Sequence, residues 1–121
     1  MILGLPIFYV ELDVFSGRRN ATWPLAAEES RELLARVDRL STPDAEMPAA
    51  LGYRGFIVYR STAGRPNRWL HVGCGVVRIA HNHRLRRYRD TEHIEEWLRQ
   101  QAISRGYRAL LGSAPKQEEP C

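Results

Sequence analysis

Alternation of apolar and polar positions near the start of the chain predicts a β-strand. Between Ile7 and Phe15 every second residue is apolar, namely Phe8, Val10, Leu12 and Val14. Successive side chains of a strand point to opposite faces, so this spacing predicts a strand with one buried face.

Two other segments show helical spacing. Residues 25–40 place apolar side chains three or four positions apart, at Leu33, Leu34, Val37 and Leu40. A second helix is expected from Asp90 or Thr91, either of which can cap it, to Arg105, with Gly106 just beyond its end. Its predicted buried stripe consists of Ile94, Trp97, Leu98 and Ala102.

The middle of the chain reads as antiparallel sheet. Short runs at 55–60, 68–72 and 76–80 have strand composition, and they are separated by a polar turn at 61–67 and by Gly73-Cys74-Gly75. The chain is therefore predicted to be α+β, with a mostly antiparallel sheet of three to four strands and two helices packed on one face. We expect a single domain over 1–111 and a disordered tail over 112–121.

Composition narrows the class of protein. The formal net charge is +4, and Lys116 is the only lysine among 18 basic residues. This excess of arginine fits either a GC-rich genome or an anionic partner, since guanidinium groups suit carboxylates and phosphates. No basic residue precedes the N-terminal apolar run, no stretch is long enough to span a bilayer, and two cysteines are too few for a disulfide framework. We expect a cytoplasmic protein without a membrane partner.

A basic run follows the predicted sheet. Arg84, Arg86, Arg87 and Arg89 surround Tyr88. Basic stripes with aromatic residues occur in proteins that bind nucleic acids, although charged residues also protect edge strands from unwanted pairing. The sequence has no recognisable nucleic-acid-binding module, so nucleic-acid binding through Arg84–Arg89 is kept as an alternative function.

Four residues could form a metal site. His71, Cys74, His81 and His83 lie within a short stretch, and a strand would place His81 and His83 on one side. Cys74 between two glycines is equally consistent with a small residue in a turn. A small His/Cys metalloprotein is therefore a further alternative, and no metal is expected in the favoured interpretation.

The segment between the first predicted strand and the first predicted helix is expected to be a loop, and it carries varied side chains. Glu11 and Asp13 share one strand face, which is the usual polar face of a half-buried strand. Arg18, Asn20 and Trp23 then combine a guanidinium, an amide and an indole, which are typical anchors of protein interfaces. We expect these three residues, with Arg84, Arg86 and Arg87, to bind a partner, although Trp23 would alternatively serve as a core residue.

The stretch ELDVFSGRRNATWPL, residues 11–25, resembles the opening of a group of small bacterial proteins with the signature E-x-D-x-F-S-G-R-x-N-x-x-W, and LGYRGF matches more loosely. Some members resemble the small partner subunit of multinuclear non-haem iron oxidases that modify ribosomally made peptides, as in the thiaglutamate pathway. The resemblance implies a non-catalytic subunit that helps an iron enzyme hold its peptide substrate, with the iron on the other chain.

Phosphate-binding, dinucleotide-binding, Cys-x-x-Cys and serine-hydrolase motifs are absent from the sequence. We therefore expect a non-catalytic accessory or recognition subunit without its own cofactor, which binds a partner enzyme, an anionic peptide, or both.

Overall fold

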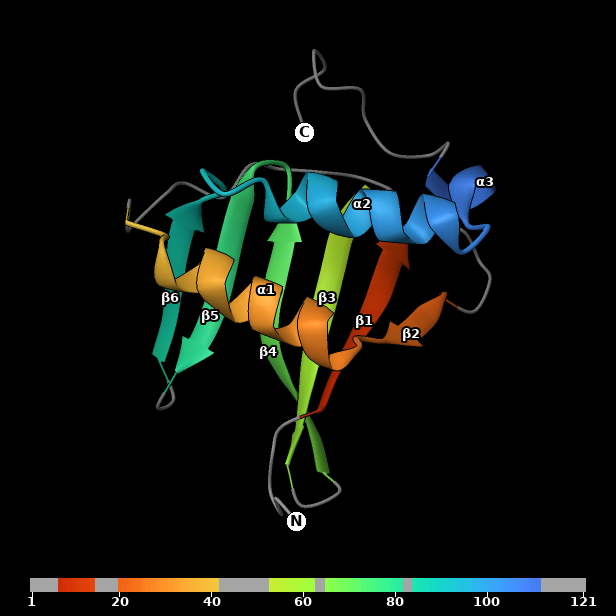
Figure 1. The fold of residues 1–121 in the computed structure, drawn as a ribbon. Helices are drawn as coiled ribbons and strands as arrows, with labels where there is room; N and C mark the ends of the chain where they lie inside the picture. The colour runs from red at the N-terminus through yellow and green to blue at the C-terminus, as the bar shows by residue number, and fades with distance from the viewer. Residues whose placement is uncertain (1–6, 15–19, 42–52, 63–64, 82–83, 112–121) are drawn as a thin grey trace.

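The computed structural model describes residues 7–14, 20–41, 53–62, 65–81 and 84–111. These residues form an α+β fold in which one antiparallel sheet carries two helices on one face (Figure 1). The elements in chain order are β1 (Ile7–Val14), β2 (Thr22–Pro24), α1 (Ala27–Asp38), β3 (Tyr53–Thr62), β4 (Arg65–Gly73), β5 (Val76–His81), β6 (Arg84–Arg89), α2 (Ile94–Ser104) and α3 (Arg108–Leu111).

The sheet has six strands in the order β2-β1-β3-β4-β5-β6, so the expected number of three to four was too low. Two strands account for the difference. Thr22–Pro24 pairs with β1 where a loop was expected, and the arginine-rich segment Arg84–Arg89 pairs with β5. The two strands lie at opposite edges of the sheet. An edge strand pairs with one neighbour and is often short or charged, so no regular apolar pattern marks it in the sequence.

The hairpin between β3 and β4 is longer than predicted. Its pairing continues through Ser61↔Pro66 to Thr62↔Arg65, although polar residues 61–67 were expected to form the turn. At the other end of the hairpin, Gly55 adopts a φ of +89° close to the carbonyl of Val72. A Cβ atom at Gly55 would lie 2.0 Å from that oxygen, so glycine allows the two backbones to approach here.

The hydrophobic core lies between the sheet and the helices. The alternation of β1 is confirmed, since its even-numbered residues from Phe8 to Leu12 are buried, and Leu33 of α1 packs against the same cluster. Leu34 is an exception to the predicted stripe, because 40% of its surface remains exposed. In α2 the predicted residues Ile94, Leu98 and Ala102 are all fully buried.

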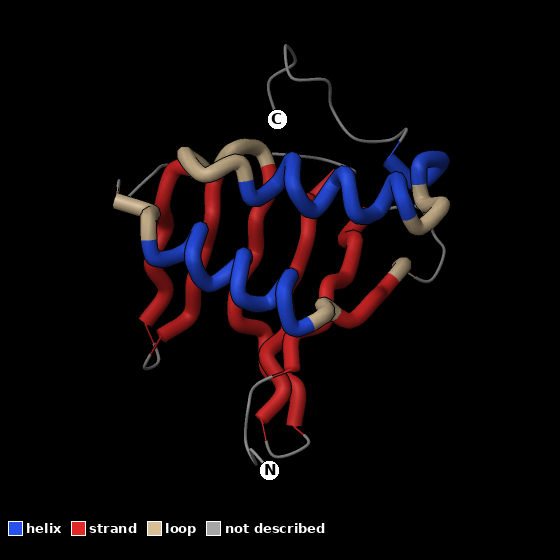
Figure 2. The backbone as a smooth tube through the Cα atoms, viewed as in Figure 1, coloured by secondary structure: helices blue, strands red, loops and turns tan. Residues whose placement is uncertain are grey.

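The two long helices run antiparallel, side by side across the sheet (Figure 2). Arg105, beyond the end of α2, forms an ion pair with Glu29 near the start of α1. As predicted, Gly106 follows the end of α2, with a φ of +90° that suits glycine at this position. No described element covers the opposite face of the sheet, which we call the open face, although Ile57 and Val76 on this face are buried.

Candidate binding surfaces

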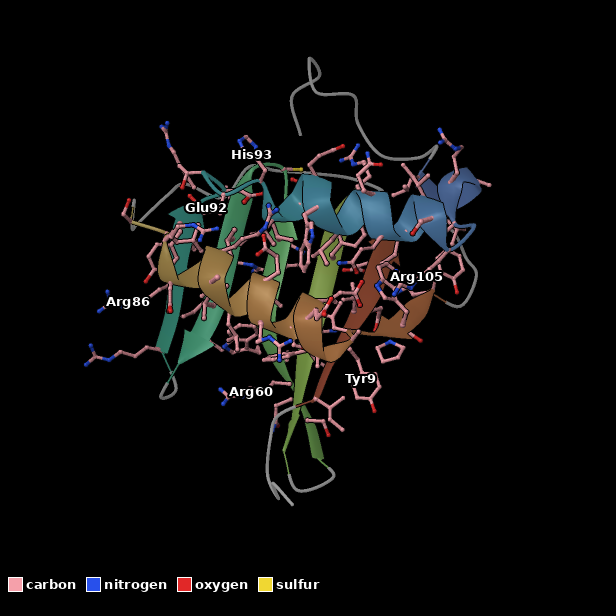
Figure 3. All side chains as sticks on the ribbon, in the orientation of Figure 1. Tyr9, Arg60, Arg86, Glu92, His93 and Arg105 are labelled. Carbon is pink, nitrogen blue, oxygen red and sulfur yellow. The ribbon has the colours of Figure 1, made fainter. Side chains whose placement is uncertain are left out.

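The first candidate surface is β6, the edge strand Arg84–Arg89, which we call the basic edge. Five of its six residues are exposed, and four of these are arginines. Figure 3 shows Arg86 extending outward from this edge. An edge strand also leaves backbone N–H and C=O groups available for another strand.

The basic edge has two sides, which its sequence alone did not separate. Arg86 pairs with Ile79, whereas Arg87 pairs with Arg78. Paired residues point to the same face, so Arg84 and Arg86 lie on the helix side and Arg87 lies on the open side. The three arginines therefore do not form one continuous patch on a single face.

Tyr88 does not offer an aromatic platform. Its side chain is partly buried and packs against the hydrophobic core, opposite Val77 in the register. The combination of arginines and an accessible aromatic ring, on which the nucleic-acid alternative depended, is therefore incomplete at this edge.

Trp23 belongs to the core, which was the alternative expectation for this residue, and it is not an exposed interface anchor. Only 4% of its surface is exposed. Its ring stacks on Tyr107 with centroids 5.7 Å apart, and its Nε1–H donates a hydrogen bond of 3.0 Å to Oε1 of Gln101. The short strand β2 places it there, because Trp23 pairs with Val10 on the buried side of β1.

Asn20 is engaged within the fold. Its Nδ2 donates a hydrogen bond of 2.7 Å to Oε2 of Glu11, and the hydroxyl of Tyr59 donates one of 2.9 Å to the other oxygen of that carboxylate. Burial and then the hydrogen bond to Glu11 raise the pKa of Tyr59. Glu11 thus connects the segment before β2 to β3, and Arg18, the third predicted anchor of this segment, lies outside the described residues.

A second candidate surface is a pocket of about 200 Å³ next to the open face. Ile57, His71 and Arg78 line it from three neighbouring strands, in the register Ile57↔His71 and His71↔Arg78. Because these positions alternate with buried, helix-facing residues, their side chains point to the open face. The sequence contains these residues, but only the strand order brings them together.

The pocket combines charge with apolar surface. Arg68 and Arg78 contribute two guanidinium groups, and Asp13 is the carboxylate in the lining. Nε of Arg78 is buried and has no hydrogen-bond partner. The apolar part of the lining comes from Ile57, Trp69, Leu70, Ala80 and Leu85.

The structure describes only part of the candidate metal site. His71 lines the open-face pocket, whereas Cys74 is in the β4–β5 turn with a φ of 54°. The side chain of His81 and the whole of His83 lie outside the described residues. Within the described residues no three His, Cys, Asp or Glu side chains are grouped closely enough to hold a metal ion.

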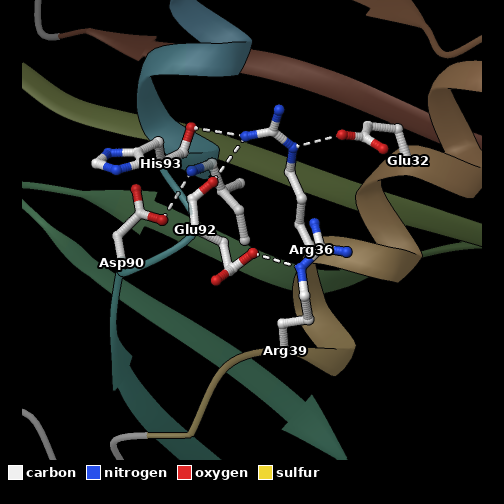
Figure 4. Close-up of polar contacts among 7 residues, drawn as sticks. Glu32, Arg36, Arg39, Asp90, Glu92 and His93 are labelled. Atoms are coloured by element: carbon white, nitrogen blue, oxygen red, sulfur yellow. Dashed lines mark hydrogen bonds and ion pairs between the residues drawn. The ribbon is translucent and has the colours of Figure 1, made fainter.

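A polar cluster joins the end of α1 to the start of α2 (Figure 4). Arg36 donates a hydrogen bond of 2.7 Å to the carbonyl oxygen of Glu92, and Arg39 donates one of 2.6 Å to the Glu92 carboxylate. Asp90, one of the two predicted caps, accepts hydrogen bonds from the backbone N–H groups of Ile94 and Glu95. These contacts fix the loop after β6 and give the cluster a structural role.

Comparison with known proteins adds no family assignment. No family model, curated protein or solved structure matches the chain. Among the described residues, no helix is both long and apolar enough to cross a membrane.

Proposed function

We propose that this chain is a non-catalytic recognition subunit that binds an acidic, extended segment of a peptide or partner protein along the basic edge. The observation that carries the proposal is that β6 is an edge strand and is also the most arginine-rich strand of the sheet. One element thus offers both a backbone template and positive charge.

Strand addition explains why arginines on both sides of β6 would be useful. Side chains of an added strand alternate between the two faces, so acidic residues on one side would meet Arg84 and Arg86, and those on the other would meet Arg87 and Arg89. Backbone hydrogen bonds would supply affinity independent of sequence. Pairs of opposite charge across the strands would select acidic segments.

The same arginines would discourage unsuitable partners. A basic strand paired directly against β6 would be repelled, and an apolar strand would desolvate guanidinium groups without compensation. Arg84, Arg86, Arg87 and Arg89 form no ion pair with any described carboxylate.

The class of partner that we propose rests on the resemblance of residues 11–25 described above. That resemblance implies a multinuclear non-haem iron oxidase that modifies a ribosomally made peptide. In this proposal the iron and the catalysis belong to the partner, and this chain contributes recognition of the acidic segment. Affinity purification of the tagged chain from its host tests this part, and co-purification of an iron-containing enzyme with a peptide is the expected result.

Binding of synthetic peptides tests the edge itself. An end-blocked peptide with alternating Glu and Val presents its Glu side chains on one face, where they would meet the arginine pair on that side of β6. It should bind, whereas its Gln-Val counterpart should bind about tenfold more weakly, because two or more ion pairs of up to about 1 kcal/mol each are lost. The double variant Arg86→Glu/Arg87→Glu should lose binding.

The matched control is Arg31→Glu/Arg108→Glu, which makes the same charge change at exposed residues of α1 and α3. It should retain most of the affinity. Equal binding of both peptides, or equal losses in the two double variants, would contradict the proposal. Tighter binding of a short single-stranded DNA than of the acidic peptide would favour the nucleic-acid alternative.

A further inference from the structure

We infer that the basic edge selects a segment with its residues in the order acidic, apolar, acidic, acidic, apolar, acidic. The inference rests on the function proposed above and adds the order of side chains in the bound segment. Its basis is that each side of β6 carries one residue that is not an arginine. Leu85 is that residue on the open side, and Tyr88 is that residue on the helix side.

Hydrogen bonding to β5 determines which backbone groups of β6 can meet an added strand. The N–H of Asp90, immediately after β6, donates a hydrogen bond of 2.8 Å to the carbonyl oxygen of Gly75. Backbone groups alternate in direction along an antiparallel strand, so those of Leu85, Arg87 and Arg89 point away from β5.

The carbonyl oxygen of Arg89 is already engaged, because it accepts a hydrogen bond of 2.8 Å from the N–H of Thr91. An added strand can therefore exchange both backbone hydrogen bonds only with Leu85 and Arg87. These bonds form with any sequence, so the side chains decide which residues of the segment take these places.

The open side of β6 favours an apolar residue at one position. Leu85 leaves 60% of its surface exposed and pairs with Ala80, so its cross-strand neighbour is apolar as well. A residue of the added strand directly opposite Leu85 would meet no guanidinium group there. An apolar side chain at this place would remove the exposed leucine surface from water, whereas the places opposite Arg87 and Arg89 favour acidic residues.

The helix side favours an apolar residue at a different position. Tyr88 pairs with Val77 and packs, partly buried, against the hydrophobic core. A carboxylate directly opposite Tyr88 would lose part of its hydration without gaining a cation in return. An apolar or aromatic side chain is therefore favoured at this place, and acidic side chains are favoured opposite Arg84 and Arg86.

The two sides together define one order of residues. From Arg84 to Arg89, β6 runs basic, apolar, basic, basic, aromatic, basic. The complementary order places two apolar residues three positions apart, each between acidic residues. It is the same in both directions along the chain, so it applies to a parallel and to an antiparallel added strand.

Two end-blocked peptides of equal composition test this order by titration calorimetry. Glu-Val-Glu-Glu-Val-Glu should bind about fivefold or more tightly than Glu-Glu-Val-Val-Glu-Glu, because no register of the second peptide places valines opposite both Leu85 and Tyr88. Gln-Val-Gln-Gln-Val-Gln should bind most weakly. Equal binding of the two Glu peptides, with weaker binding of the Gln peptide, would overturn the order and leave the recognition of acidic segments intact. Absence of binding by all three would overturn both.

Replacement of Leu85 tests one position of the order. Leu85→Arg changes an exposed side chain, so the fold should be retained. In this variant Glu-Val-Glu-Glu-Glu-Glu, Glu-Glu-Glu-Glu-Val-Glu, or both should gain about threefold or more relative to Glu-Val-Glu-Glu-Val-Glu, because a glutamate then faces the new guanidinium group. A gain by the first peptide alone would indicate an antiparallel added strand, and a gain by the second alone a parallel one.

The matched control is Leu34→Arg, which makes the same change at an exposed leucine of α1. It should leave the relative affinities of the three peptides unchanged. Unchanged relative affinities in Leu85→Arg, or an equal gain in Leu34→Arg, would overturn the position assigned to Leu85 and with it the inferred order.

Discussion

The indole N–H of Trp23 donates a hydrogen bond to the side-chain oxygen of Gln101, 3.0 Å away, and thereby joins the short strand β2 to helix α2. Both residues are buried, with 4% and 8% of their surfaces exposed. The contact connects an edge of the sheet to the last helical turns, and it explains how a strand of three residues is held in place.

Truncation of Trp23 should therefore lower the stability of the fold. Trp23→Ala should reduce the free energy of unfolding by about 3–5 kcal/mol, because it leaves a large cavity in the core. Trp23→Phe keeps most of the ring but leaves the Gln101 oxygen without its hydrogen-bond donor, and the free energy of unfolding should fall by about 1–3 kcal/mol. Denaturant unfolding of both variants checks this order, and a Trp23→Ala protein as stable as the parent would show that the indole is not part of the core.

Gly55 and Gly106 allow a test of backbone crowding. Both have φ near +90°, but a Cβ at Gly55 would meet the Val72 oxygen, whereas nothing lies within 4 Å of a Cβ at Gly106. Gly106→Ala should cost about 1–2 kcal/mol from conformation alone. Gly55→Ala should cost distinctly more, since the β3–β4 pairing must also shift. Similar unfolding free energies for the two variants would argue against close approach at Gly55.

Asp90 should make stability depend on pH. Burial raises the pKa of Asp90 above the ordinary 3.8, against the opposing effect of its hydrogen bonds from Glu95 and Ile94. The neutral form is thus favoured by folding, so this contribution is present below pH 3.8 and is lost as pH rises through the raised pKa of the folded state.

Replacement of Asp90 separates its charge from its capping. Asp90→Asn retains an acceptor oxygen and should remove this part of the pH dependence, whereas Asp90→Ala also loses the cap, at a cost of about 0.5–2 kcal/mol. Melting temperatures across acidic pH provide the measurement. Parallel pH profiles for the parent protein and Asp90→Asn would show that the carboxyl does not titrate as described.

The sequence predicted those elements whose apolar residues repeat regularly. Alternation from Phe8 to Leu12 identified β1, and the spacing of Ile94, Leu98 and Ala102 identified α2. The edge strands lacked such a signal. In β6, Leu85 is 60% exposed and its neighbours are charged, and Tyr88 alone is partly buried, so the segment has no apolar alternation.

The candidate sites depend on contacts distant in sequence, and this limited their prediction. The exposure of Arg84, Arg86 and Arg87 could be anticipated from their charge, but their division between two faces follows from the register with β5. Trp23 is a residue type common among interface anchors, yet its pairing with Val10 directs the side chain into the core. The open-face pocket could not be predicted, because it requires β3, β4 and β5 to be neighbours.

Amide hydrogen exchange with and without the alternating Glu-Val peptide tests the central claim most directly. Strand addition predicts slower exchange at alternate amides of Arg84–Arg89, because an edge strand directs every second N–H outward and the added strand would bond it. The opposite edge strand, β2, serves as the internal control and should not change. Two results would contradict recognition of an acidic segment by the basic edge. One is unchanged exchange of the β6 amides when the protein is saturated with peptide, and the other is slower exchange at β2 in place of β6.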